Sequence, residues 1–203
     1  METVIVFLVV FIPVVWGIWR MLLFTRDTIG RNSPLKTFRT YKTTPWSFFV
    51  RMDPLAGLGA FLFSGYLFNV ALFGYIPPEE HEVLSRIFLF VLAFLMITIG
   101  IFVFALYSNH WRYAKGIIIN TFPDTHELEI AFPDVRFRLN SNNIERVREY
   151  NNDNVKLPLI CTEYFLTNGD HFIISAKANG AWVIQEYFKS AAVEVINQKT
   201  SFI

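Results

Sequence analysis

The sequence contains a single cysteine, Cys161, among 203 residues. One cysteine excludes an internal disulfide framework and any metal site built from several cysteines. Charged residues are scarce as well, at 17%, whereas an average soluble domain has roughly a quarter. The formal net charge is +1, so the chain lacks the excess of positive charge that nucleic-acid binding requires. We therefore expect no nucleic-acid partner.

The patterns that support catalysis are missing too. The sequence has no Gly-rich phosphate loop, no His-x-x-x-His pair and no serine in a nucleophile elbow. Cys161 falls in a strand-like segment, which favours a small buried core residue over a nucleophile. We predict no catalytic residue, no cofactor and no metal ligand, and a protein that is not an enzyme.

Apolar side chains are abundant, at 53% of the residues. Long apolar stretches lie at about 3–24, 55–76 and 87–107, and about 20 apolar residues suffice for a helix to cross a bilayer. A cleaved signal peptide is the alternative for the first stretch, but Glu2 replaces the usual basic cluster and no small-residue cleavage site follows. We predict three spans within a transmembrane region at residues 1–107, the last two forming an antiparallel hairpin.

The charges in the loops predict the orientation. Residues 26–53 contain six basic and two acidic residues, whereas Glu79, Glu80 and Glu82 outnumber Arg86 between the second and third spans. Lys and Arg are retained on the cytoplasmic side. We expect a multi-pass protein of the cell (inner) membrane, with the loop 25–54 and the domain 108–203 in the cytoplasm and the amino terminus outside.

Small residues recur every four positions in the second span, at Ala56, Ala60 and Ser64. Such a face lets helices approach closely in lipid. Asn69 lies further along the same span, where an unpaired amide is costly, so we expect it to face another helix. A transport role for this amide is the alternative.

The first loop combines Arg39 and Lys42 with Trp46. Basic residues beside an aromatic side chain are typical of a segment that lies along lipid headgroups. The alternative is that these residues supply only orientation charge and an interfacial anchor.

Residues 108–203 show a different pattern, with short alternating segments separated by turns. Asn168-Gly169 is a strong hairpin signal, because both residues accept positive φ. Apolar residues from Ala181 to Val195 fall at helical spacing behind Asn179, a possible helix cap. The pattern predicts a C-terminal helix after strands within 111–122, 127–132, 136–139, 144–150, 160–167 and 171–175.

This order of elements resembles a pleckstrin-homology-like (PH-like) domain over about residues 110–197. The resembling segments are 143–147 and 164–175, and the bacterial branch places such a domain after transmembrane hairpins. The resemblance implies a membrane-associated binding or scaffold module without catalytic residues. It also implies that lipid phosphates would be bound by basic residues around the first hairpin. We assign that hairpin to the turn 122–127, which is acidic here.

The carboxy-terminal region has one arginine cluster. Its members could form a positive stripe towards anionic lipid or an acidic partner, or a solvated face balanced by Glu145 and Glu149. The cluster consists of Arg136, Arg138, Arg146 and Arg148.

The predicted fold is an α+β membrane protein, in which three transmembrane helices precede a PH-like curled antiparallel sheet or barrel capped by a C-terminal α-helix. The predicted function is a membrane-anchored, non-enzymatic binding or scaffold module. Its expected partners are the lipid bilayer and a protein partner or further copies of the chain. An immunity-type protein that protects the membrane against a toxin is the alternative. A transporter or channel accessory subunit ranks third.

Overall fold

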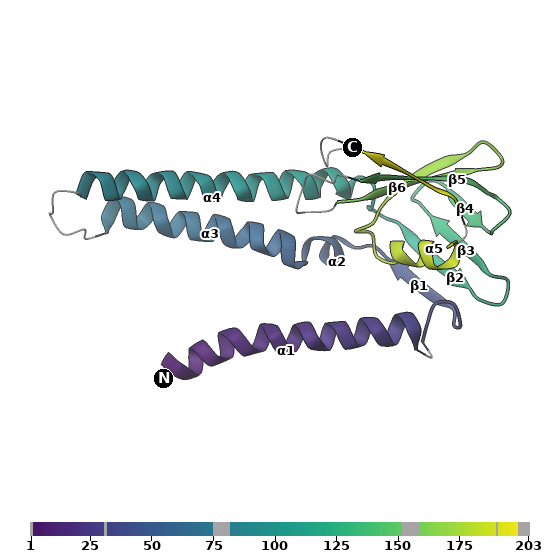
Figure 1. Ribbon diagram of the computed structural model, residues 1–203, viewed down its shortest axis with the longest axis horizontal. Helices are drawn as coiled ribbons and strands as arrows, with labels where there is room; N and C mark the ends of the chain where they lie inside the picture. Colours follow the sequence, from purple (N-terminus) through teal and green to yellow (C-terminus); the bar gives the residue numbers. More distant parts are fainter. Residues whose placement is uncertain (1, 31, 75–81, 152–158, 190, 199–203) are drawn as a thin grey trace.

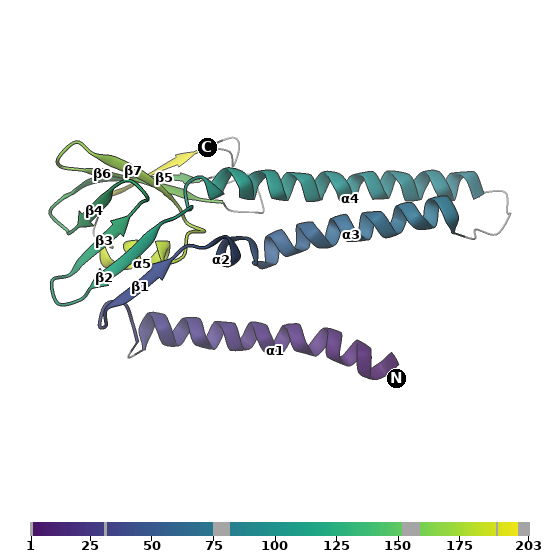
Figure 2. The ribbon, with the colours of Figure 1, turned by 180° about the vertical axis from the view of Figure 1, so that it is seen from behind.

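Three long helices extend from one side of a β domain (Figures 1 and 2). The structure is a computed structural model that describes residues 2–30, 32–74, 82–151, 159–189 and 191–198. The helices are α1 (Glu2–Ile29), α3 (Met52–Phe73) and α4 (Glu82–Trp111), and the five-residue helix α2 (Pro45–Phe49) lies at the base of α3.

The β domain contains two sheets of four strands. The first sheet is antiparallel, in the order β1 (Arg39–Lys42), β2 (Ile118–Phe122), β3 (Glu127–Ala131) and β4 (Arg136–Leu139). The second has the order β7-β6-β5-β8, formed by β5 (Ile144–Asn151), β6 (Cys161–Leu166), β7 (His171–Ser175) and β8 (Val193–Asn197). The short helix α5 (Ala181–Tyr187) packs between them.

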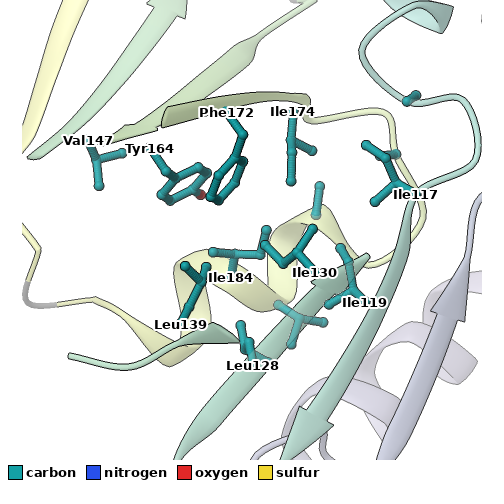
Figure 3. Packing of buried hydrophobic residues seen from close by; sticks show 14 of the residues in the cluster. Ile117, Ile119, Leu128, Ile130, Leu139, Val147, Tyr164, Phe172, Ile174 and Ile184 are labelled. Carbon is teal, nitrogen blue, oxygen red and sulfur yellow. The ribbon is translucent and has the colours of Figure 1, made fainter. Parts of the chain in front are cut away.

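The core lies between the sheets, and Figure 3 shows side chains from both pointing toward α5. Leu128 and Ile130 are fully buried in the first sheet, while Tyr164 and Ile174 of the second sheet are almost completely buried. Ile184 of α5 lies among them. Along β2 and β3, more buried and less buried side chains alternate. The strands were predicted from such alternation in the sequence, and β2 to β7 are confirmed.

The helices are inserted into the first β-hairpin. Strand β1 pairs with β2 in antiparallel register from Arg39↔Thr121 to Lys42↔Ile118. In the sequence, α2, α3 and α4 all lie between these two strands. The turn 122–127, assigned above to the first hairpin, instead joins β2 to β3. That assignment was wrong because β1 precedes residue 108, and local patterning does not reveal a partner so distant in sequence.

The number of spans also requires correction. Two helices in the described part of the chain are long and apolar enough to cross a membrane, α3 with mean hydropathy 1.7 and α4 with 3.0. In α1 the described residues add only the shorter apolar segment Val14–Leu23. Arg26 and Asp27 end its apolar sequence.

The predicted C-terminal helix is too long. Helix α5 ends at Tyr187, and Val193–Asn197 forms β8, which pairs with β5 in parallel rather than antiparallel. The β-branched residues Val193, Val195 and Ile196 favour extended backbone. An open edge of β5 is available to them, and this pairing overrides the helical spacing.

Candidate functional site

Helix α5 and the inner face of the second sheet enclose a groove of about 390 Å³. This volume falls in the range of about 300–1,000 Å³ common for ligand pockets. We call it the α5 groove, and its principal lining residues are Val147, Glu149, Tyr164, Ile184, Phe188 and Val193.

The alternation of β5 directs its side chains into or away from the groove. Val147 and Glu149 line it, so Arg146 and Arg148 project from the opposite face of the sheet. Val147 and Tyr164 point toward Ile184 of α5 (Figure 3). The lining is therefore mainly apolar, with Glu149 on the strand that forms its floor.

Glu149 is the distinctive group of the groove. Its side chain is half-buried, and in the described part of the chain it makes no hydrogen bond or ion pair. Burial is the main cause that raises the pKa of Tyr164, and the Glu149 carboxylate raises it further. Lys189, also at the groove, pairs with Glu186 at 2.6 Å. A carboxylate in an apolar lining suits a cationic group on an apolar stem.

The β domain is joined to the helices by a polar cluster at the base of α3. Asp53, in the first turn of α3, accepts hydrogen bonds from the Tyr107 hydroxyl of α4 and from Lys177 Nζ, the latter at 3.2 Å. Lys177 follows β7. The cluster therefore connects both inserted helices to the second sheet.

A second cluster joins α4 to the same sheet. His110 Nδ1 lies 3.3 Å from Ser175 Oγ and 3.3 Å from Cys161 Sγ, and all three residues are fully buried. Burial raises the pKa of the Cys161 thiol to about 12, so the thiol is protonated at neutral pH. A buried and protonated thiol does not serve as a nucleophile. The sequence did not reveal this contact, because His110 and Cys161 are distant in the chain.

Helix α2 fills the junction with aromatic side chains. Thr44 and Ser47 form a capping box at its start, and Phe48 is fully buried, 5.7 Å from the Tyr107 ring and 5.1 Å from the Trp111 ring between centroids. Trp46 is 77% exposed beside the base of α3. Trp46, predicted to lie along headgroups, is thus outside the core, whereas Phe48 of the same helix is inside it.

The basic residues predicted to contact lipid both lie on β1. Lys42 is exposed at the end near α2, whereas Arg39 lies at the other end of the strand and donates its backbone N–H to Thr121 Oγ1 at 2.8 Å. Lys42 and Trp46 are therefore near the base of α3. Arg39 is further from it.

The structure divides the arginine cluster between the sheets. Arg136 and Arg138 on β4 pair with Glu129 at 3.6 Å and Glu127 at 2.6 Å. Arg146 and Arg148 on β5 lie over the Phe165 ring, at 4.4 and 5.1 Å from its centroid. Arg148 also pairs with Glu194 of β8 at 2.8 Å.

The predicted helix-packing residues occupy different sides of α3. Ser64 is buried and donates to the Ala93 carbonyl of α4 at 3.0 Å, whereas Ala60 is half-buried and Ala56 is exposed. Asn69 lies on the exposed side of α3. Gly57 makes the close approach instead, since a Cβ there would lie 3.1 Å from Val103.

Two sheets packed around a short helix, with a groove along that helix, form a small β domain. Among the described residues no group of three or more His, Cys, Asp or Glu could hold a metal ion. The PH domain family model matches residues 40–176, more than half of the chain, and the chain belongs to this family.

The matched range begins in β1, includes the inserted helices and ends just after β7. PH domains are generally non-enzymatic binding modules that commonly bind lipids or proteins. Comparison with the curated proteins and with the solved structures gave no significant match.

Proposed function

We propose that this protein is a membrane-anchored binding module, in which α3 and α4 cross the bilayer and hold the PH domain at its surface. The observation that carries the proposal is the exposed apolar surface of these helices. Leu62, Phe73 and Phe88 are 70%, 80% and 64% exposed, and lipid would cover such side chains. Contiguous apolar surface of this extent is rare on a soluble monomer.

The charges at the two ends of the hairpin support a cytoplasmic PH domain. Lys42 and Arg51 lie at the base of α3 next to the β domain, whereas at the far end Glu82 begins α4 and pairs with Arg86 at 3.1 Å. Basic residues favour the cytoplasmic side. The loop 75–81, which carries Glu79 and Glu80, lies outside the described residues.

The α5 groove indicates the class of partner. A half-buried carboxylate on an apolar floor is matched by a lysine or arginine side chain, whose aliphatic stem contacts the lining while its charged end reaches Glu149. Tethering at the membrane raises the local concentration of a membrane-bound partner, so a modest intrinsic affinity suffices.

Cysteine labelling tests the anchoring. Cys161 is buried, so an added cysteine supplies the reactive thiol. With a membrane-impermeant maleimide on intact cells, we expect Glu80→Cys to react, and Asp124→Cys in the β2–β3 turn to react only after lysis. Labelling of Asp124→Cys in intact cells, with Glu80→Cys protected, would overturn the orientation.

Site-specific photocrosslinking tests the groove. A photoreactive side chain at Gln185, which lines the groove, should give a defined adduct in the native cells, whereas one at Thr125 in the β2–β3 turn should not. We expect Glu149→Gln to abolish the adduct and Glu145→Gln, an exposed control on the same strand, to preserve it. Equal adducts from Gln185 and Thr125 would contradict the assignment.

A further inference from the structure

One face of α3 has no partner among the described residues. It carries side chains at the alternating spacing of three and four residues that characterises a helix–helix seam. Four of the five leucines of α3 lie on it, and all its members are exposed. We call it the seam, and it consists of Leu55, Leu58, Leu62, Gly65, Asn69 and Leu72. Helix α4 packs elsewhere, against Gly57, Ser64 and Ala71.

Asn69 is the polar member of the seam. Its side chain is exposed and makes no hydrogen bond to the rest of the described chain. It lies five residues before the C-cap Gly74, and thus about 7 Å inside the far end of the helix at about 1.5 Å per residue. An amide facing hydrocarbon without a partner is costly, so the position favours a second helix.

Gly65 lies one turn before Asn69 on the same face. Nothing is within 4 Å of the position that its Cβ would occupy, so the backbone of α3 is open to close approach there. Small residues at such positions allow two helices in lipid to pack at short distance. The neighbouring Asn69 can then reach across the interface.

We propose that two copies of this chain associate in the membrane through the seam, with α3 parallel to the partner's α3 and Asn69 hydrogen-bonded to the partner's Asn69. The inference rests on the proposed function, since α3 must cross the bilayer. Copies inserted in the same orientation have parallel α3 helices, and a two-fold axis along the membrane normal places each seam residue opposite its own copy.

A second copy fits better than another helix of the same chain. A carboxamide both donates and accepts hydrogen bonds, so two Asn69 side chains related by two-fold symmetry satisfy each other reciprocally. Helix α1 contains no Asn or Gln that could make the same pair. The dimer would also place two α5 grooves on one assembly, which increases the avidity for a partner with two binding segments.

Disulfide trapping tests the geometry. Leu62→Cys lies on the seam, and its neighbour Phe63→Cys, also exposed, is the matched control on a different face. After oxidation in native membranes, we expect a disulfide-linked dimer from Leu62→Cys and monomer from Phe63→Cys. Equal crosslinking of both, or monomer from both, would overturn the seam. Monomer from Leu62→Cys is also the result expected if α1 covered the seam in the same chain.

Single-molecule photobleaching in lipid bilayers measures dimerisation and tests the contributions of Asn69 and Gly65 to it. We expect Asn69→Leu and Gly65→Leu to weaken dimerisation at least about fivefold and Asn69→Gln to retain it. Gly59→Leu is the control, because Gly59 is also exposed with nothing within 4 Å of its Cβ position but lies off the seam. Unchanged association in Asn69→Leu, or equal loss in Gly59→Leu, would contradict the proposal.

The same samples separate this inference from the proposed function. Resistance of the protein to alkaline carbonate extraction, together with the labelling pattern above, reports anchoring alone. Anchored monomers would overturn the dimer and leave the membrane-anchored module in place. Release of the protein by carbonate would overturn both.

Discussion

Cys161 illustrates how the surroundings of a single side chain set its chemistry. The thiol is fully buried beside His110, and burial raises its pKa to about 12. A histidine next to a cysteine would suggest an activated thiolate if the pair were open to solvent. Here the pair is closed and joins α4 to the second sheet.

Thiol reactivity provides a test of this environment. We expect Cys161 to resist maleimide at pH 7–8 in the folded protein and to react after denaturation, because the reactive thiolate is suppressed. The raised pKa means that the folded state retains a proton that the unfolded state loses, so this contribution to the free energy of unfolding decreases from about pH 9 to about pH 12. Rapid labelling of the native protein would contradict the burial.

Two glycines with positive φ allow steric clash to be separated from backbone strain. Gly180 has φ +83° and a Cβ there would lie 2.5 Å from Tyr41 Cβ, whereas Gly169 has φ +88° with nothing within 4 Å. We expect Gly169→Ala to cost about 1–2 kcal/mol of unfolding free energy and Gly180→Ala at least about 2 kcal/mol more. Thermal unfolding of both variants measures the difference, and equal losses would contradict the close approach.

Strand β8 buries little of its side-chain surface. Four of its five residues, all but Ile196, are exposed. The strand lies at the edge of the sheet beside β5. Its pairing therefore depends mainly on backbone hydrogen bonds and on the ion pair between Arg148 and Glu194.

Truncation after Ala192 tests this description. We expect the protein without β8 to unfold cooperatively with a midpoint about 5–10 °C lower, because few apolar side chains lose their burial. Tryptophan fluorescence during heating follows the transition. Complete loss of the transition would show that residues 193–198 belong to the core, as the predicted long helix would have required.

In the assembled protein, the PH domain depends on residues from both sides of the helical insertion. Strand β1 pairs with β2, Tyr187 donates its hydroxyl to the Pro34 carbonyl at 2.7 Å, and the backbone N–H of Asn179 donates to Thr43 Oγ1 at 2.9 Å. The segment before α2 is thus part of the domain in space although it is distant in sequence.

A rearranged chain tests this dependence. We expect residues 108–203 expressed alone to remain unfolded, since one edge of the first sheet and the contacts to α5 are missing. Residues 32–43 joined through a short Gly-Ser loop to 117–198 should fold, because Lys42 lies opposite Ile118. Circular dichroism and proteolysis compare the two, and equal protection would contradict the role of β1.

The local elements could be predicted from the sequence because their signals are local. Alternating apolar residues such as Leu128 and Ile130 identify a strand, and the apolar runs of α3 and α4 identify helices suited to lipid. The division of the arginines between two sheets was not predictable, because Arg138 and Arg146 are close in sequence but belong to different sheets.

Features that depend on pairing between distant segments could be identified only from the three-dimensional structure. The insertion of the hairpin between β1 and β2, the contact of His110 with Cys161 and the groove beside Glu149 each bring together residues that no spacing rule connects. The pattern of apolar residues in the sequence indicates which side chains are buried. Which segments pair with one another is determined by sheet register and close packing, and these depend on the entire chain.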